Sequence, residues 1–414
     1  MGSGAVYPVV RTGNIACVLG TIELVRALGL GGIRCAVVAR HDDPGRFSRF
    51  TIDAVDWLDP AVHAERLVER LLEFAATQPE PPVLYYEGDA DLLLVSRFRD
   101  RLRTAFRFVI ADSELVESLV HKWRFQRLAE KLELPVPRAR LIRSMGGEVD
   151  DLDLRFPVVV KPIMRETETW RPFAAAGLAK AVLVQTPRDL RTLRPLLAEA
   201  GIDVLTQELV VGPESQVESY HAYIHESGEL VAEFTGRKIR TRPATFGYST
   251  ALVITEQQDV ADIGRKILRR LGLRGVAKVD LKRAEDGTLW LLEVNPRFNL
   301  WHHPAALAGV NVPRLVYRDV LGLPRTRPSP PRAGVRWCWP DQDIRAAREA
   351  GIPLRTWFRW MLTCEARSAF APTDPMPFVR GVIWGGISRR LRSRAGHDEK
   401  RHRSRRPARR RTIG

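Results

Sequence analysis

The segment LLEVNPRFN, residues 291–299, combines apolar strand residues with side chains that could do chemistry. Glu293 and Asn295 are two residues apart, so on a strand they point to the same face. The neighbouring Leu291 indicates that this face is at least partly buried. Burying a carboxylate without a partner costs several kcal/mol, so we expect a positive group beside Glu293.

A hairpin brings a second carboxylate to this place. Asp286-Gly287 is a strong signal for a two-residue type I′ turn, which pairs Asp280 with Glu293 and Lys278 with Asn295. Directly opposed residues have Cβ atoms about 4.5–5.5 Å apart, and two carboxylates that close share either a proton or a cation. Together with the amide oxygen of Asn295, this all-oxygen set predicts Mg²⁺ or Mn²⁺.

The alternative is an exposed hairpin whose acids point to water. The opposite faces of both predicted strands are also apolar, with Ala277, Val279 and Leu281 on one strand and Trp290, Leu292 and Val294 on the other. Strands that are apolar on both faces are typical of a covered sheet, which favours the metal site.

Three lysines are candidate phosphate ligands. Lys161 ends the apolar run FPVVVK, where a lysine needs an anion unless it reaches the surface by snorkelling. Lys238 follows Arg237 near the end of another strand, and an exposed basic strand end explains it equally well. Lys122 lies among many charges on a predicted helix, and taken alone it is a solvent-facing residue.

The elements that position these residues follow from the apolar patterns. Up to about residue 111, short apolar runs (ACVL, CAVVA and PPVLYYEG) alternate with helical patterns, the first of which ends at Gly31-Gly32. This alternation predicts a parallel sheet with helices on its faces. The chain has no G-x-G-x-x-G after these strands, so a dinucleotide site is not indicated.

Helices and hairpins alternate in the middle of the chain. We expect one helix from Asp112 or Ser113 to Pro135, and another that begins with Thr186 as N-cap and Pro187 at its first position. VLTQELVVG predicts a strand, and a hairpin turns at Ser227-Gly228. A further helix presents one apolar face, formed by Val260, Ile263, Ile267 and Leu271.

Four segments together, VVVKP, TQELVVGPE, VDLK and LLEVNPR, resemble the ATP-grasp superfamily over about residues 115–322. The spacing from Asp280 to Glu293, followed by E-x-N-x-R, is similar to the metal strands of D-alanine–D-alanine ligases and biotin carboxylases. EFTGRKIRTRPATFGYST and NPRFNLWHHPAALAGVNVPRLVYRDVLG resemble bacterial carboxylate–amine ligases of the D-aspartate ligase type. The resemblance implies an α/β and α+β fold, with a preATP-grasp Rossmann-like domain before a two-lobed ATP-grasp domain with antiparallel sheets.

The resemblance also implies a role for each matching residue. Nucleotide binding falls to Lys122 and Lys161 at the α- and β-phosphates of ATP, to Gln207, Glu208 and Val210 in the adenine cleft, and to Glu214 at the ribose. The metal ligands are Asp280, Glu293 and Asn295, which hold two Mg²⁺ ions. The catalytic residues are Lys238 at the γ-phosphate and Arg297, whose planar fork suits the transferring phosphoryl group or the tetrahedral intermediate.

Two positions depart from the family pattern. Where the family has a Gly-rich loop over the phosphates, MRETETWRPFAAAGLAKA contains only Gly177, which puts lid closure in doubt. An aspartate often precedes the first phosphate lysine, whereas this chain has His121, which we interpret as a helix-surface residue. We assign His302-His303 to packing or substrate contact rather than to a metal.

Length and charge separate a body from a basic tail. The 414 residues exceed one ordinary core, and we divide them into a first domain (1–111), an ATP-grasp domain (112–323, small lobe about 123–205, large lobe about 206–323), an extension (324–387) and a tail (388–414). The tail holds twelve Lys or Arg and two acids, a net +10 of the total +16, and we expect it to be disordered. Four scattered cysteines without Cys-x-x-Cys, and no span or export signal, predict a reduced cytoplasmic protein.

These observations predict an ATP-dependent ligase that joins a carboxylate, from the resemblance an amino acid, to an amine through an acyl-phosphate. The alternatives are a nucleotide-binding protein without chemistry and a protein whose basic tail binds nucleic acid or a membrane surface. The body carries no RNA or DNA motif, so no specific nucleic acid is expected. Two partners stay open: an anionic lipid surface for the tail, which would place the protein at the inner face of the membrane, and a second copy in a homodimer.

Overall fold

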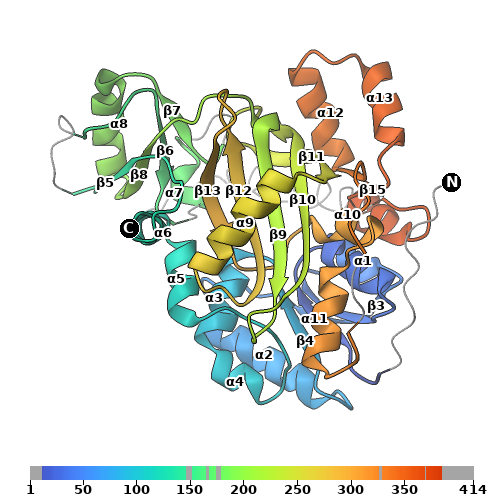
Figure 1. Ribbon diagram of the computed structural model, residues 1–414. Coiled ribbons are helices and arrows are strands. Elements are labelled where there is room, and N and C mark those ends of the chain that lie inside the picture. The colour runs from blue at the N-terminus through green and yellow to red at the C-terminus, as the bar shows by residue number, and fades with distance from the viewer. Residues whose placement is uncertain are drawn as a thin grey trace, which may run out of the picture.

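The computed structural model describes residues 12–145, 152–164, 167–173, 179–325, 329–368 and 370–384. Three sheets organise these residues: a parallel sheet near the N-terminus, a small antiparallel sheet, and a large sheet between them (Figure 1). The predicted combination of a parallel sheet with antiparallel sheets is confirmed. The expected disordered tail, residues 388–414, lies outside the described residues.

The first sheet has four parallel strands in the order β3-β2-β1-β4. Its strands are β1 (Ala16–Leu19), β2 (Cys35–Ala39), β3 (Thr51–Asp56) and β4 (Val83–Tyr86). Its helices are α1 (Ile22–Leu30), η1 (Pro44–Phe47), α2 (Ala64–Ala76), α3 (Asp89–Arg97) and α4 (Arg99–Arg103). Strands β1, β2 and β4 are buried throughout, as their apolar runs predict, whereas the sequence analysis does not predict the more exposed β3.

The carboxyl ends of β1 and β4 mark a topological switch point. The chain leaves β1 toward β2 on one side of the sheet, while β4 pairs with β1 on the other side. Open α/β sheets bind ligands at such points, because the two flanking loops diverge and leave a crevice. Helix α3 starts at this edge with Asp89, directly after Gly88.

The single helix predicted after Asp112 is wrong, because the structure has two helices, α5 (Ser113–Val120) and α6 (Lys122–Lys131). His121 separates them with ψ at 107°, and its Nδ1 accepts a hydrogen bond from the backbone N–H of Arg124 (3.3 Å). His121 therefore caps α6 and is not the helix-surface residue we expected. The break makes Lys122 the first residue of α6, and its N–H donates to the carbonyl of Ile163.

The small sheet has the strand order β5-β8-β6-β7, and all its pairs are antiparallel. Its strands are β5 (Ala139–Ile142), β6 (Val158–Pro162), β7 (Val182–Val184) and β8 (Val204–Glu208). The accompanying helices are α7 (Thr167–Trp170) and α8 (Pro187–Glu199). Helix α8 starts as predicted, because Thr186 and Asp189 form a reciprocal capping box.

The large sheet has the strand order β13-β12-β9-β10-β11-β14-β15. The strands are β9 (Val217–Ile224), β10 (Leu230–Arg242), β11 (Tyr248–Thr255), β12 (Gly275–Arg283), β13 (Leu289–Asn295), β14 (Arg336–Cys338) and β15 (Ala366–Arg367). A short helix η3 (Glu214–Gln216) precedes β9, and α9 (Gln258–Arg270) packs on one face of the sheet (Figure 1). Helix α9 buries Val260, Ile267 and Leu268, so its predicted apolar face is confirmed.

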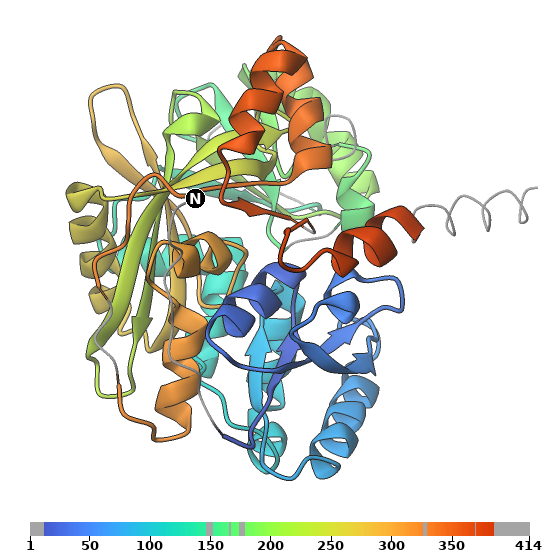
Figure 2. The same cartoon turned by 90° about the vertical axis from the view of Figure 1, so that its right-hand side faces the viewer.

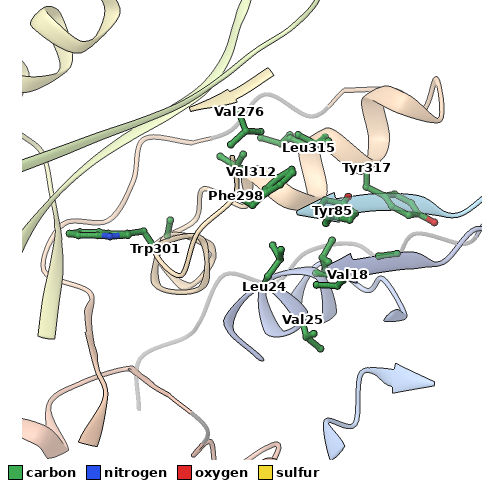
Figure 3. Close-up of a cluster of buried hydrophobic side chains, with 14 of the residues drawn as sticks. Val18, Leu24, Val25, Tyr85, Val276, Phe298, Trp301, Val312, Leu315 and Tyr317 are labelled. Carbon is green, nitrogen blue, oxygen red and sulfur yellow. The ribbon is translucent and has the colours of Figure 1, made fainter. Parts of the chain in front are cut away.

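A hydrophobic cluster joins the first domain to the large sheet and to helices α10 (His302–Leu307) and α11 (Val312–Val320) (Figure 3). Leu24 and Tyr85 from the first domain lie in the same cluster as Val276, Phe298 and Leu315. Tyr85 also donates a hydrogen bond to the carbonyl of Pro313. The first domain and the large sheet are therefore held together by a shared core.

The C-terminal extension completes the large sheet through β14 and β15 and carries α12 (Pro340–Glu349), α13 (Leu354–Leu362) and the π-helical η4 (Pro377–Trp384). The pair α12 and α13 stands at the end of the molecule opposite the first domain (Figure 2). All four cysteines are buried, and none forms a disulfide. Within the described ranges, no helix has the length and apolar character that a bilayer span requires.

Candidate functional site

The hairpin of β12 and β13 carries the predicted metal ligands, and its pairing is as predicted at that point. Asp280 is opposite Glu293, and Lys278 is opposite Asn295. Asp280 is buried, whereas the side chain of Glu293 is exposed toward a pocket that Asp280 and Asn295 also line. Two carboxylates and one amide therefore share one sheet face at the pocket wall.

The predicted two-residue turn is wrong, although the resulting pairing is right. Ala284 and Thr288 close a three-residue loop, with a hydrogen bond from the N–H of Ala284 to the carbonyl of Thr288 (2.8 Å), and Gly287 has φ at +86°. This loop pairs Leu281 with Leu291, one residue out of the predicted register. An extra residue, Leu292, then forms a bulge and restores the pairing of Asp280 with Glu293.

A lysine lies beside the acidic pair. Lys278 Nζ is 2.5 Å from Asp280 Oδ2, and the hydroxyl of Ser219 on β9 donates to Asp280 Oδ1 (2.5 Å). Lys278 therefore neutralises part of the charge that the sequence analysis assigned to a cation. The sequence analysis gave Lys278 no role, although its position two residues before Asp280 on a strand places both side chains on one face.

The electrostatics around Glu293 favour its ionised form. Desolvation by the surrounding pocket walls pushes the pKa of Glu293 upward although its side chain opens into the pocket, but the charge of Lys278, the contact with Asp280 and the charge of Lys180 outweigh this effect. The net result is a pKa well below the usual range of a glutamate. Asn295 Nδ2 also donates to Glu293 Oε1 (3.1 Å). The pocket therefore holds an anionic carboxylate next to the charged side chain of Lys278.

The donor set fits a hard divalent cation. Asp280, Glu293 and Asn295 offer only oxygen ligands, which Mg²⁺ and Mn²⁺ prefer over nitrogen or sulfur. The described residues contain no group of three or more His, Cys, Asp or Glu side chains suited to a metal, so an amide must complete any set at this place. A cation here would take over the neutralising role of the Lys278 ammonium.

The pocket brings together residues of the first domain, of α5 and α6, and of the small and large sheets. The residues predicted to bind the nucleotide that line it are Lys122, Lys161, Gln207, Glu208, Val210 and Glu214, and Lys238 joins them. The predicted metal ligands line it as well, and so does Asp89 of the first domain. Arg297 does not line the pocket, but it contacts Asn295 and Asp89 at its wall.

Lys161 lies at the end of β6 with its ammonium in the pocket. Its Nζ donates to Gln207 Oε1 (2.9 Å), a neutral partner. Burial, reinforced by the positive charge of Lys122, lowers the pKa of Lys161 to about 8, and the charge of Glu293 opposes this shift only in part. The sequence argument that a lysine here needs an anion agrees with this depressed pKa.

The side chains of β8 are held from both sides of the strand. Gln207 Nε2 donates to Gln126 Oε1 of α6 (3.3 Å), which fixes the amide that receives Lys161. Glu208 accepts hydrogen bonds from the backbone N–H of Arg155 (3.0 Å) and from its Nη2 (3.0 Å). The Glu208 carboxylate thus binds Arg155 with both oxygens, and a ligand in the pocket would contact the backbone of Glu208 instead.

Two lysines flank the predicted ribose ligand. Glu214 lies 3.6 Å from Lys238 Nζ and 4.0 Å from Lys282 Nζ, and all three side chains are largely buried. Burial lowers the pKa of Lys282, with Glu214 acting in the opposite direction. Lys282 belongs to the quoted motif VDLK, so its place two residues after Asp280 on the same strand face could have identified it.

Three further predictions concern residues near the pocket. His303 packs against the first domain, with its Nδ1 2.7 Å from Glu23 Oε2, which agrees with a packing role. His302 is buried, its pKa is lowered to about 3 by burial, and neither ring nitrogen has a hydrogen-bond partner among the described residues. In the Gly-poor lid segment, residues 165, 166 and 174–178, including Gly177, lie outside the described residues.

Comparison with known proteins gives this site a context. Residues 203–342 match the family described as ATP-grasp in the biosynthetic pathway with Ter operon. The chain is 23% identical over 287 residues to a D-aspartate ligase of Enterococcus faecium, covering 67% of this chain and 68% of that protein. It is 27% identical over 219 residues to a D-alanine–D-alanine ligase of Halorhodospira halophila, covering 49% of this chain and 65% of that protein. The aligned part is thus about two thirds of each of these relatives.

Solved structures show the same fold at low sequence identity. An ADP complex of an N5-carboxyaminoimidazole ribonucleotide synthetase has a TM-score of 0.56 at 17% identity and covers 76% of this chain and 79% of that one. An L-amino acid ligase from Bacillus licheniformis has a TM-score of 0.55 at 14% identity, covering 78% and 76%. The predicted fold, a Rossmann-like domain followed by a two-lobed ATP-grasp domain, is therefore confirmed.

Proposed function

We propose that this ATP-grasp protein is an ATP-dependent ligase that joins a carboxylate to an amine through an acyl-phosphate. One observation carries the proposal: Asp280 and Glu293 face each other beside Asn295, on the wall of a pocket that also contains Lys161 and Lys238. Acidic groups and lysines facing each other suit a polyphosphate and its divalent cation. Similarity to the D-aspartate and D-alanine–D-alanine ligases supports the reaction class.

The nucleotide would lie between the small and the large sheet. In this proposal the backbone of Glu208 and Val210 contacts the base, and Glu214 accepts from the ribose hydroxyls. Lys161 and Lys122 neutralise the inner phosphates, and Lys238 binds the γ-phosphate. The buried amide of Gln207 holds the Lys161 ammonium in the pocket until phosphate oxygens replace this neutral partner.

Asp280, Glu293 and Asn295 would hold Mg²⁺ or Mn²⁺, which when bound neutralises phosphate charge. This chain's own residues then position the reactants. Lys278, freed from Asp280, remains on the same face as a second positive charge. Arg297 follows the strand of the candidate ligands and contacts Asn295, and in this proposal its guanidinium stabilises the developing negative charge.

The proposed reaction has two displacements. First, a substrate carboxylate oxygen attacks the γ-phosphorus, the bond to the β-phosphate oxygen breaks, and ADP leaves as the acyl-phosphate forms. Second, an amine attacks the acyl carbon, the bond to the phosphate oxygen breaks, and phosphate departs while the nitrogen loses a proton. Positioning and charge neutralisation supply the catalysis in both steps. By analogy with its relatives, the carboxylate belongs to an amino acid.

The domain division also remains a proposal. We keep the first domain (1–111), the small lobe (about 123–205), the large lobe (about 206–323) and the extension (324–387). Two sheets cross these limits. Strand β8 of the small sheet extends to Glu208, beyond the small lobe, and strands β14 and β15 of the extension join the large sheet. The extension therefore supports the same sheet that carries the candidate metal ligands.

The test is a screen for ADP release with amino acids paired with amines, followed by mass spectrometry of the product. Asp280→Asn and Glu293→Gln should each abolish ADP release, because each removes one carboxylate from the pocket. Glu285→Gln, an exposed residue in the turn of the same hairpin, is the matched control and should keep wild-type turnover.

The screen also separates the alternatives. Near-normal turnover in either pocket variant would contradict the metal assignment. Nucleotide binding without ADP release for any pair would favour the alternative of a binding protein without chemistry. A chain truncated at residue 387 should keep its ADP release as a ligase, whereas a protein that acts through its basic tail should lose its function.

We also propose that the extension contacts an anionic lipid surface. Helix α13 exposes Leu354, Phe358 and Leu362, which are spaced four residues apart on one face, with Arg355 and Arg359 beside them and no acid in the helix. An apolar stripe flanked by arginines suits an anionic membrane interface. Co-sedimentation with phosphatidylglycerol vesicles should exceed that with phosphatidylcholine and should fall when the three apolar residues become serine. Equal binding to the two kinds of vesicle, or equal binding by the wild type and the serine variant, would overturn this idea. A dimer that the serine substitutions dissociate would also overturn it, because the apolar stripe would then be a contact between two copies.

A further inference from the structure

An ion pair connects the first domain to the strand that carries the candidate metal ligands. Arg297, two residues beyond β13, lies with its Nε 2.5 Å from Oδ1 of Asp89, the first residue of α3. The side chains are 14% and 25% exposed, so the contact lies mostly inside the protein. Asp89 sits at the switch point of the first sheet and lines the candidate pocket. The ion pair therefore spans the boundary between the two parts at the site itself.

An acid at the first position of a helix is often only a partner of the helix dipole. In α3 the N–H of Gly88 donates to Asp91 Oδ2 (3.0 Å), whereas the carboxylate of Asp89 contacts Arg297 and the residue lines the pocket. Asp89 therefore has a partner across the domain boundary as well as its place at the start of the helix.

The guanidinium of Arg297 is held by several acceptors. Its Nε donates to Asp89 and its Nη2 to Asn295 Oδ1 (3.3 Å), while Nη1 lies 3.5 Å from the carbonyl of Phe298. Contacts at different nitrogens fix the plane of the fork as well as its position. One of these acceptors, Asn295, is itself a candidate metal ligand, so the orientation of Arg297 is coupled to the metal strand.

We propose that Asp89 is a positioning residue for Arg297, through which the first domain orients the guanidinium toward the reacting phosphoryl or acyl group. This inference rests on the proposed ligase function. Asp89 does not touch ATP in this role. It restricts the guanidinium before the reaction, so that less reorganisation remains when negative charge develops. Loss of Asp89 should therefore affect the chemical step more than nucleotide binding.

The kinetic test is a double-mutant cycle measured by ADP release. Asp89→Ala should lower kcat about tenfold to a hundredfold, as expected for a misplaced catalytic group, with the KM for ATP changed by less than about twofold. Asp89→Asn keeps an acceptor oxygen and should retain more activity than Asp89→Ala. In the background of Arg297→Ala, the change Asp89→Ala should have an effect below about twofold, because the group that it positions is absent.

The matched control is Glu117→Gln, which removes the carboxylate partner of Arg97 in an ion pair between α3 and α5, and neither residue lines the pocket. It should leave all kinetic constants unchanged. An undiminished effect of Asp89→Ala in the Arg297→Ala background would show that Asp89 acts without Arg297 and would overturn the inference. Wild-type kcat in Asp89→Ala would overturn it as well.

A spectroscopic measurement keeps the inference testable if the proposed reaction is wrong. The Nε–H signal of Arg297, assigned by its disappearance in Arg297→Lys, should be protected from solvent exchange in the wild type and lose that protection in Asp89→Ala. No ADP release by the wild type with any substrate pair would contradict the ligase function, while this signal still decides the positioning. Equal exchange in the two proteins would overturn the positioning role itself.

Discussion

At the scale of single residues, burial lowers the pKa of Lys161 in the candidate pocket. Its ammonium is buried in the pocket with a neutral amide as hydrogen-bond partner, and its pKa falls to about 8 from 10.5. The folded protein therefore binds the Lys161 proton more weakly than the unfolded chain does. This difference lowers the free energy of unfolding in full below about pH 8, and the loss disappears as pH rises toward 10.5. A bound phosphate would reverse the penalty by supplying negative charge.

This depressed pKa predicts a pH-dependent nucleotide affinity. Above about pH 8 the free protein loses the Lys161 proton, so ADP must bind together with a proton, and its affinity should weaken by up to about tenfold per pH unit. Calorimetric titration in buffers of different ionisation enthalpy measures both the affinity and the proton uptake.

Lys161→Arg is the matched control for this prediction, because an arginine stays charged over the whole range. The variant should bind ADP with no proton uptake near pH 9, whatever its absolute affinity. Equal proton uptake by wild type and variant would assign the linkage to another group and contradict the placement of Lys161 at the phosphates.

At the scale of elements, the β12–β13 hairpin depends on its bulge. The three-residue loop shifts the pairing by one residue, and Leu292 shifts it back before Glu293. Side chains alternate between the two faces of a strand, so a one-residue change moves every following side chain to the other face. The bulge is therefore the feature that places Glu293 opposite Asp280.

Insertion of one alanine after Leu292 should remove the acidic pair from the pocket. The inserted residue would take the place opposite Asp280, and Glu293 and Asn295 would move toward the face covered by α9, or the strand would lose its pairing. Mn²⁺-dependent nucleotide binding, measured by paramagnetic relaxation of water, should fall to background.

Leu292→Ala is the control for this insertion, because it shortens a side chain at the bulge and keeps the residue count of the strand. It should retain Mn²⁺-dependent binding, with a modest loss from the smaller pocket wall. Binding by the insertion variant at the level of Leu292→Ala would show that the register of β13 does not determine the candidate metal site.

At the scale of the whole molecule, a buried ion pair attaches the C-terminal extension to the first domain. Arg26 on α1 and Asp374 are each 2% exposed, with Arg26 Nε 3.2 Å from Asp374 Oδ2. Asp374 also accepts hydrogen bonds from the hydroxyl of Ser48 (2.8 Å) and the N–H of Arg49 (2.8 Å). Chain segments more than 300 residues apart in sequence thus share one polar cluster.

Asp374→Ala should destabilise the protein strongly, because it leaves Arg26 buried without its carboxylate. Breaking one partner of a buried pair costs about 3–5 kcal/mol, so the free energy of unfolding in urea should fall by that amount. The surface pair of Arg97 and Glu117 is the comparison, and Glu117→Gln should cost less than about 1 kcal/mol. Equal stability of the two variants would show that this cluster does not hold the extension.

The sequence by itself predicted the residues of the candidate site and most of the elements that carry them. Apolar alternation identified β12 and β13, and residue types identified the candidate oxygen ligands and lysines, because these properties depend on residues near each other in the chain. The resemblance to ATP-grasp enzymes gave the order of the domains. The same local rules missed the cap at His121, since an imidazole can either face solvent or accept a backbone hydrogen bond.

Only the tertiary structure decided which distant groups meet. Lys278 lies against Asp280, Arg297 against Asp89, and Arg26 against Asp374. The last two pairs join segments that approach because a shared hydrophobic core packs the first domain onto the large sheet, and no local pattern encodes that approach. The bulge at Leu292 belongs to the same class, because the pairing of two strands, and not the turn sequence alone, set the final register.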